Sequence, residues 1–267
     1  MSFELSAFII VKNQAQRISA TILSLQALAR EIIVVDNGNC AQASKIASSL
    51  GCKVIYHFQH SDLSQKAFAE NLCAYDWVIN IDSDEVLSQD LQHEISYIFT
   101  TGLHEKYKGY WIDLPIMMLC DAKPRLWSPK HRRLRLYNKK YASFSFAKDV
   151  NADGAILNAG FDPKSHLSRM LAPAYNYSLS SISQLVRKLN FYTDQQTLDL
   201  IHAERGFSPI RVCFEFFFSL IKYYFLRRYF VFGFRGLIYS MIFAFARFLR
   251  CAKVYDIVNS VDTKSKI

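Results

Sequence analysis

The chain has 267 residues, of which 51% are hydrophobic, and it carries a formal net charge of +9. This length and composition allow a large buried core, which excludes an intrinsically disordered chain. Its six cysteines include no C-x-x-C pair, which disfavours a zinc site or a disulfide scaffold and indicates reduced thiols in the cytoplasm.

Strands and helices are expected to alternate along the N-terminal part of the chain. Compact apolar runs predict buried strands over residues 5–11, 31–36, 53–57 and 76–81. Helical spacing and stop signals predict helices over residues 18–29, 41–50 and 64–74. Continuous apolar strands that alternate with helices indicate an α/β protein with a Rossmann-like, mostly parallel sheet covered on both faces.

Polar residues follow three of these strands where each strand ends. They are Lys12-Asn13, Asp36-Asn37-Gly38 and Asp82-Ser83-Asp84. Parallel sheets bind ligands beyond the carboxyl ends of their strands, so these groups should converge on one crevice. Asp82 and Asp84 would point the same way on an extended chain. Two such oxygen donors suit Mg²⁺ or Mn²⁺ bridged to a diphosphate; the alternative is a polar strand end before a helix.

Glycine motifs for phosphate binding are missing from the sequence. No G-x-G-x-x-G follows the first strand and no G-x-x-x-x-G-K-[ST] occurs, which disfavours a dinucleotide dehydrogenase and a P-loop NTPase. Without a glycine cradle, a metal must neutralise more of the phosphate charge. This reasoning favours the metal interpretation of the acid pair.

The middle of the chain contains a basic, aromatic stretch. A helix from about residue 88 leads to a strand over 109–114, and short strands and loops are expected over 115–160. Arg132, Arg133 and Arg135 follow Trp127 closely. Guanidinium groups pair bidentately with phosphate, so this cluster could grip a phosphorylated, lipid-linked sugar. The alternative is an exposed basic loop.

The final third is expected to be helical and basic. Helices are predicted over roughly 178–204, 208–230 and 236–255, and residues 205–253 hold nine basic residues and one acid. The longest uncharged run, 236–246, is too short to cross a membrane. Apolar faces beside cationic faces predict helices in a membrane interface, although the aromatics could instead pack on the catalytic body. Nucleic-acid binding is disfavoured because these aromatics are helical and apolar rather than arranged on a sheet or groove.

Four segments in this order and spacing carry a family resemblance. They are Ser6-Ala7-Phe8-Ile9-Ile10-Val11-Lys12-Asn13, Glu31-Ile32-Ile33-Val34-Val35-Asp36, Gln65-Lys66, and Asp76-Trp77-Val78 through Asp82-Ser83-Asp84-Glu85. The chain resembles family 2 glycosyltransferases of the GT-A fold, and within them a short bacterial branch that contains lipopolysaccharide core β-1,4-glucosyltransferases. The resemblance implies a GT-A nucleotide-sugar-binding and catalytic domain over 1–175. It leaves 176–267 as a helical, amphipathic, membrane-interfacial region.

The resemblance also implies an activity. It is the inverting transfer of a hexose, with glucose expected, from a UDP-sugar to a lipopolysaccharide or lipooligosaccharide core acceptor. Mn²⁺ or Mg²⁺ would be the cofactor. The protein would sit peripherally on the cytoplasmic face of the inner membrane, with a lipid-linked oligosaccharide as acceptor and no nucleic-acid partner.

Residue roles follow from the same resemblance. Asn13, Asp36, Lys66 and Asp82 are expected to bind the donor, and Asp82 with Asp84 to form the metal site. Asp149 matches the family's catalytic base. There Ala147-Lys148 replace the family's Val-His, so Asp153 is an alternative base. After Asp36 the chain reads Asn37-Gly38-Asn39-Cys40 and lacks the family's second acid.

Two other classes of protein remain as alternatives. A sugar nucleotidyltransferase shares the sheet type, but it requires a glycine-rich loop that residues 11–17 lack, and it releases pyrophosphate. A non-catalytic membrane-associated adaptor would account for the basic C-terminal region but not for three converging acids.

Overall fold

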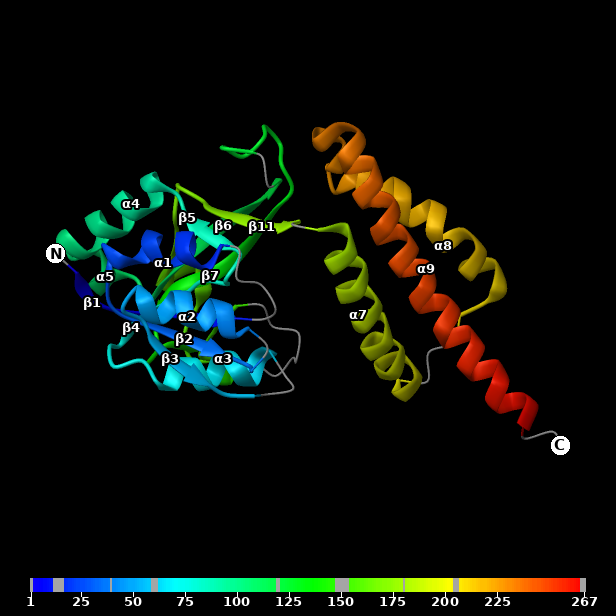
Figure 1. Ribbon diagram of the computed structural model, residues 1–267, viewed down its shortest axis with the longest axis horizontal. Coiled ribbons are helices and arrows are strands. Elements are labelled where there is room, and N and C mark those ends of the chain that lie inside the picture. The colour runs from blue at the N-terminus through cyan, green and yellow to red at the C-terminus, as the bar shows by residue number, and fades with distance from the viewer. Residues whose placement is uncertain are drawn as a thin grey trace. The chain divides into compact units, whose positions relative to one another are not determined.

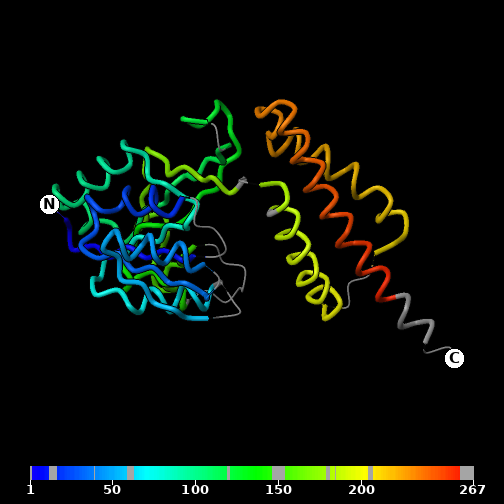
Figure 2. Tube along the Cα trace, in the orientation of Figure 1, coloured from blue at the N-terminus to red at the C-terminus, as the bar shows by residue number. Residues whose placement is uncertain are grey.

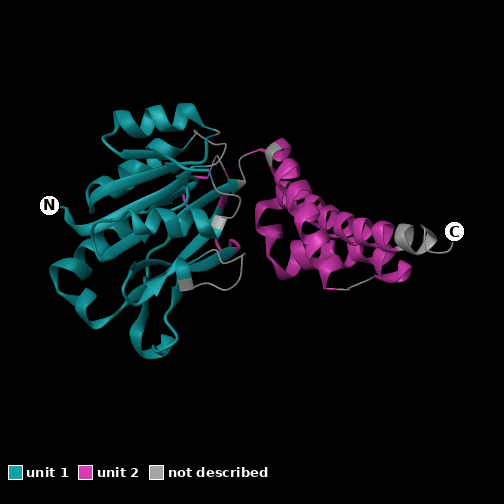
Figure 3. Ribbon diagram, turned by 90° about the horizontal axis from the view of Figure 1, so that it is seen from below, with its two compact units in different colours: residues 1–116, 130–178 teal, residues 117–129, 179–267 magenta. Residues whose placement is uncertain are grey.

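The computed structural model describes residues 2–11, 17–38, 40–58, 62–118, 121–146, 154–179, 181–203 and 207–264. The chain divides into two compact units (Figure 3). Unit 1 comprises residues 1–116 and 130–178, and unit 2 comprises residues 117–129 and 179–267. The division at 178–179 lies close to the expected boundary at 175–176, while 117–129 groups with the C-terminal unit. The functions assigned to the two parts stay predictions.

Unit 1 is built on one mixed sheet. Its strands are β1 (Phe3–Val11), β2 (Ala29–Asp36), β3 (Lys53–Tyr56), β4 (Trp77–Asn80), β5 (Glu85–Leu87), β6 (Gly109–Met118), β7 (Lys130–Asn138), β10 (Leu167–Arg169) and β11 (Ala174–Leu179). In the described part of the chain these nine follow the order β3-β2-β1-β4-β7-β6-β11-β5, with β10 beside β6 (Figure 1). The short strands β8 (Ala142–Ser143) and β9 (Ile156–Leu157) pair separately.

Helices cover both faces of this sheet. They are α1 (Ile18–Gln26), α2 (Ala41–Ser49), α3 (Asp62–Asn71), α4 (Gln89–Thr100), α5 (Leu103–Lys106) and α6 (Pro163–His166). Strand side chains alternate between the faces, so Leu5, Ala7 and Ile9 of β1 pack with α1, α2 and α4. Phe8 and Ile10 enter a second cluster with residues of α3 and the turn Phe144–Phe146.

The expected α/β class is confirmed, and so is its order of elements through β4. Strands β1, β2, β3 and β4 are parallel, and each predicted strand and helix of residues 5–81 is present. The second half of the sheet differs from the expected short strands and loops. There β7 runs antiparallel to both β4 and β6, because a strand that follows β6 after a short excursion can return beside it without a crossover helix.

Unit 2 is helical, as expected. It contains α7 (Ile182–His202), α8 (Pro209–Ile221) and α9 (Gly233–Lys264), with a π-helical turn at Lys222–Leu226 and a 3-10 turn at Tyr229–Phe232. Helix α9 packs against both α7 and α8 (Figure 2). The turn before α9 requires glycine at 236, since a Cβ there would lie 1.8 Å from the carbonyl oxygen of Tyr229.

Candidate active site

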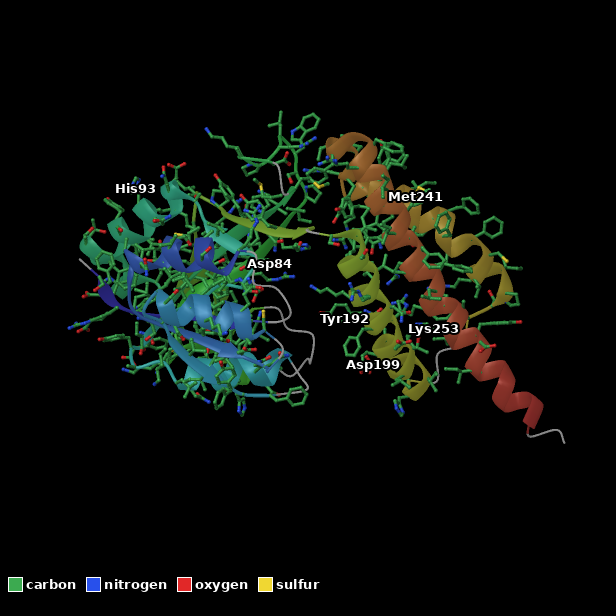
Figure 4. The ribbon with its side chains drawn as sticks, viewed as in Figure 1. Asp84, His93, Tyr192, Asp199, Met241 and Lys253 are labelled. Carbon is green, nitrogen blue, oxygen red and sulfur yellow. The ribbon has the colours of Figure 1, made fainter. Side chains whose placement is uncertain are left out.

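The acid pair lies in a tight turn between β4 and β5. All four residues of β4 are buried, and the chain then turns so that the Glu85 N–H donates to the Asp82 carbonyl oxygen at 2.9 Å. The Asp82 N–H donates back to Glu85 Oε2 at 3.1 Å. The Asp84 carbonyl oxygen accepts the Tyr177 N–H at 2.9 Å, and Figure 4 labels Asp84 at the edge of the unit 1 sheet. These bonds hold the three acidic residues at the carboxyl end of β4.

Arg135 of β7 is the cation at the centre of this turn. Its side chain is only 2% exposed. One terminal nitrogen, Nη2, donates to Asp82 Oδ2 and to Glu85 Oε1, both at 2.7 Å. The other, Nη1, donates to Asn80 Oδ1 at 2.5 Å. The antiparallel pairing of β7 with β4 delivers this guanidinium, because Leu136 lies opposite Ile79.

Asp82 is neutralised from two sides. Its second oxygen, Oδ1, lies 3.0 Å from Lys66 Nζ of α3. Burial raises the pKa of the Asp82 carboxyl, but the charges of Arg135 and Lys66 outweigh burial and hold that pKa well below its usual range. Asp82 is therefore an anion whose two oxygens are each committed to a cation.

Glu85 has the opposite electrostatic character. Its side chain is 1% exposed. Burial raises the pKa of the Glu85 carboxyl, Arg135 lowers it, and the neighbouring charges of Asp82 and Asp84 raise it again, so the net shift is upward. One arginine thus serves two carboxylates, and the more buried carboxylate holds its proton more readily.

Asp84 is the acid of this turn that best fits a metal. It is partly exposed, whereas Asp82 is held by two cations and Glu85 is enclosed. A divalent ion bridged to a diphosphate needs few protein ligands, since phosphate oxygens and water supply the others. Among the described residues no group of three or more His, Cys, Asp or Glu side chains could hold a metal by itself. The donor set therefore fits an ion bound by Asp84 together with a phosphate ligand.

Asp36 ends β2 at the same edge of the sheet. It lies opposite Val11 of β1 and is fully buried. Its Oδ1 accepts the Gly38 N–H at 2.9 Å, and its Oδ2 accepts the Ser44 hydroxyl at 2.5 Å. These bonds fix the turn into α2, where Gly38 has a φ of 92° that favours glycine.

Comparison with known proteins identifies the family. The model of glycosyl transferase family 2 matches residues 6–102, which include most of β1, all of β2 to β4 and the acid turn. An uncharacterized glycosyltransferase of Rickettsia prowazekii is 45% identical over 257 residues, covering 95% of this chain and 87% of that protein. The chain belongs to glycosyltransferase family 2. The expected resemblance to this family is confirmed.

Two more distant similarities were found. The lipopolysaccharide core biosynthesis glycosyltransferase LpsC of Rhizobium meliloti is 25% identical over 273 residues, covering 94% of this chain and 92% of LpsC. Among solved structures, glucosyl-3-phosphoglycerate synthase of Mycobacterium tuberculosis, in complex with phosphoglyceric acid, aligns with a TM-score of 0.43 and 14% identity. That alignment covers 68% of this chain and 74% of the synthase.

The structure brings together some of the residues expected to work in a family 2 transferase. Lys66, Asp82 and Asp84 are described at or beside one turn, and Asp36 ends a strand at the same edge. Asn13 and both candidate bases, Asp149 and Asp153, lie outside the described residues.

The predicted arginine cluster is divided by the structure. Arg135 is buried and bonded within the acid turn, so its guanidinium has no surface to offer an acceptor. This corrects the acceptor contact expected for it. Arg132 and Arg133 remain at least partly exposed on β7. Trp127 belongs to unit 2, is 65% exposed and has a left-handed backbone with φ 63°.

Asp113 gathers a group of cations that the sequence did not reveal. Its Oδ1 accepts Arg132 Nε at 2.8 Å, and its Oδ2 lies 2.7 Å from Lys130 Nζ and 2.6 Å from Arg169 Nη2. The three cationic side chains are about half exposed and the Asp113 side chain is 10% exposed. Three cations around one carboxylate leave a net charge of +2 at the place where β6 pairs with β7 and β10.

We expect Asp113→Asn to lower the free energy of unfolding by about 1–2 kcal/mol at neutral pH, discounted for the half-exposed cations. Burial raises the pKa of Asp113, but bonds from Arg132, Lys130 and Arg169 lower it to about 2, below the ordinary 3.8. The contribution is therefore complete above the ordinary pKa and is lost as the pH falls toward 2. Urea unfolding of both proteins as a function of pH tests this; a difference that stays constant down to about pH 3 contradicts it.

Glu70 was also not identified from sequence. This buried residue of α3 accepts the Tyr137 hydroxyl at 2.5 Å, the Ser143 hydroxyl, and the Phe144 N–H at 3.4 Å. Burial raises the pKa of its carboxyl. The network ties α3, which carries Lys66, to β7 and to the chain at 143–144. Only long-range contacts define this role, so no local pattern could have indicated it.

Proposed function

We propose that the chain is an inverting hexosyltransferase. It transfers a hexose, with glucose the first candidate, from a UDP-sugar to a lipopolysaccharide or lipooligosaccharide core acceptor on the cytoplasmic face of the inner membrane. The observation that carries the proposal is the partly exposed Asp84 beside a cation-neutralised Asp82, at the carboxyl end of β4 in a family 2 chain. The similarity to LpsC over 94% of the chain supports the choice of acceptor.

The donor half of the proposed site follows from charge. Asp84 would hold Mn²⁺ or Mg²⁺, and the bound ion would supply positive charge to the departing nucleoside diphosphate. Arg135 and Lys66 neutralise Asp82, so the turn does not present two uncompensated carboxylates to that diphosphate. Asp36, which fixes the turn after β2, is assigned to the nucleoside part of the donor. Asn13, which follows β1 in the sequence, is also assigned to donor binding.

The acceptor half of the proposed site requires a general base and residues that bind the acceptor. Asp149, with Asp153 as the alternative, takes the proton of the acceptor hydroxyl while that oxygen attacks the anomeric carbon. The C–O bond to the diphosphate breaks, and the sugar is transferred with inversion. Arg132 and Arg133 bind the anionic acceptor, and the net +2 charge around Asp113 supports an anionic group there. Trp127, which belongs to unit 2, stays a separate candidate for acceptor binding.

A donor panel tests the proposal directly. Full-length protein is incubated with UDP-, GDP- and ADP-sugars, Mn²⁺ or Mg²⁺, and deacylated or intact core oligosaccharide. The expected result is acceptor-dependent release of UDP and a product carrying one additional hexose. Release of pyrophosphate would instead identify a nucleotidyltransferase, and the absence of any turnover across the panel would contradict the proposal.

We expect Asp149→Asn to lower turnover by about 10²–10⁴-fold, because a general base typically contributes this much. Donor binding should persist, since the base acts on the acceptor hydroxyl. Asp153→Asn is the matched variant, four residues away. If only the Asp153 variant loses turnover while binding UDP normally, Asp153 is the base and the assignment to Asp149 is wrong.

A further inference from the structure

Helix α8 is amphipathic in the reverse of the usual sense. Its buried residues are Glu215 and Ser219. A row of large apolar side chains on the helix and the following turn is instead between 56% and 73% exposed: Ile210, Phe214, Phe217, Phe218, Ile221 and Phe225. Their spacing of three and four residues places them within an arc of about 100°. We call these six residues the outer face.

Polar contacts occupy the inside of unit 2. Glu215 lies 3.4 Å from Arg247 of α9 and accepts the Ser219 hydroxyl at 3.2 Å. Across the other interface, Lys253 of α9 contacts Asp194 of α7 at 2.5 Å and Asn190 at 3.0 Å, and Figure 4 labels Lys253 on α9, which packs against α7. On α8 the polar side chains Glu215 and Ser219 are buried and the phenylalanines are exposed, which is the arrangement expected of a helix whose outer side contacts an apolar medium.

Helix α9 shares this exposure. Residues Tyr229–Val258 are long and apolar enough to cross a membrane by length and composition. Their most apolar 18-residue window has a mean hydropathy of 1.5, and only 33% of that window is buried in the structure. A core helix of a soluble protein would be mostly buried. Exposed Phe234, Met241 and Phe245 add to the apolar surface of unit 2. An exposed apolar surface of this kind marks an interaction site.

Positive charges bound the apolar stretches and set their orientation. On α8, Arg211 and Lys222 lie near the two ends of the stretch 210–225 that carries the outer face. On α9, Arg235 and Arg247 enclose the uncharged run 236–246, and Arg247 also contacts Glu215 of α8. A helical run of that length extends about 17 Å, roughly half of a hydrocarbon core. A run parallel to the surface keeps the arginines at both of its ends near lipid phosphates, whereas a perpendicular run would place one of them near the middle of the bilayer.

We propose that unit 2 is a monotopic anchor. The outer face of α8 is buried at the headgroup–acyl boundary of one leaflet, α8 and α9 lie parallel to the surface, and the surrounding cations bind anionic headgroups. The excess of nine basic residues over one acid in 205–253 selects an anionic bilayer as the occupant. The anchor deepens the membrane location in the proposed function without depending on sugar transfer.

Vesicle binding by the full-length protein tests the anchor. The variant carries Phe214→Ser, Phe217→Ser and Phe218→Ser. Its matched control carries Leu23→Ser, Tyr97→Ser and Leu171→Ser, three apolar side chains of unit 1 that are 55%, 61% and 93% exposed. Sedimentation with phosphatidylcholine vesicles that contain roughly 30% phosphatidylglycerol should show affinity reduced by at least about tenfold for the variant alone. Pure phosphatidylcholine should bind the unmodified protein more weakly.

A second measurement locates the outer face without removing it. In Phe218→Trp, lipids brominated on their acyl chains should quench the fluorescence of the tryptophan at position 218 strongly. In the parent protein, the same lipids should quench the fluorescence of the three native tryptophans less. Unchanged affinity of the serine variant, or no added quenching, overturns the proposal and indicates that the face packs on unit 1 or on a second copy. Retention on vesicles in alkaline carbonate also overturns it, because that result indicates a membrane-spanning α9. Hydrolysis of the sugar donor in the absence of acceptor needs no membrane, so it reports on the transferase site alone. This measurement therefore distinguishes failure of the anchor from failure of the proposed transferase function.

Discussion

Asp84→Asn is expected to abolish transfer of the donor sugar. Asparagine keeps the size of the side chain and one oxygen, but it removes the anionic charge that a hard divalent cation requires. In the proposed mechanism the departing diphosphate would then lose its main source of positive charge, so turnover should fall by several orders of magnitude. Release of nucleoside diphosphate at saturating donor and Mn²⁺ measures the effect.

The matched control is Asp90→Asn. Asp90 lies in the first turn of α4, is exposed, and belongs to the same stretch of chain as Asp84. It should retain normal turnover and lose only a few tenths of a kcal/mol in helix stability. Both variants should unfold cooperatively. Mn²⁺ added together with UDP should stabilise the unmodified protein against unfolding, but it should not stabilise Asp84→Asn. Full turnover by Asp84→Asn would refute the metal role.

Local sequence was enough to predict the strands that position the acid turn. Apolar runs such as Ile32–Val35 and Trp77–Ile81 identify buried parallel strands, and strand ends in such a sheet must share an edge. The confirmed order of β1 to β4 follows from these two facts. The sequence alone could therefore place Asp36 and Asp82 at one edge of the sheet.

The charge pairing at that edge could not be predicted. Arg135 appeared in the sequence as one of three clustered arginines, and nothing local separated it from Arg132. The structure separates them because Arg132 lies opposite Asp113 in the β6–β7 pairing, whereas Arg135 falls at the register irregularity between Leu134 and Leu136. Arg135 reaches Asp82 and Glu85, while Arg132 reaches Asp113. Long-range pairing, and not residue type, decides which cation is buried.

The C-terminal helices illustrate the same limit. The sequence showed apolar and cationic faces, but two interpretations remained, a membrane interface or packing on the catalytic body. Periodicity cannot say which side of α8 faces α9. The structure places Glu215 and Ser219 on that side, which leaves the phenylalanines exposed.

Arg135→Met is expected to destabilise unit 1 by about 3–5 kcal/mol, the usual cost of removing one partner from a buried ion pair. Methionine fills much of the volume but leaves Glu85 enclosed with no cation on its Oε1, while Asp82 keeps Lys66. Because typical domains are stable by only about 5–15 kcal/mol, this is a large fraction of the total. Urea unfolding at about pH 7 measures it. Arg133→Met, which changes a partly exposed arginine on the same strand, should cost less than about 1 kcal/mol.

The pH dependence of Arg135→Met identifies Glu85 as the source of the cost. The pKa of Glu85 is already raised in the native protein, and loss of Arg135 removes the charge that lowers it. A folded-state pKa above the unfolded one makes the folded protein bind a proton, so stability of the variant increases as the pH falls through that pKa. The deficit should therefore be smaller at about pH 5.5 than at about pH 8. Adding Glu85→Gln should recover much of it and remove this dependence, because no uncompensated buried charge remains; an equal deficit at both pH values, or no recovery in the double variant, would show that Arg135 acts through packing alone.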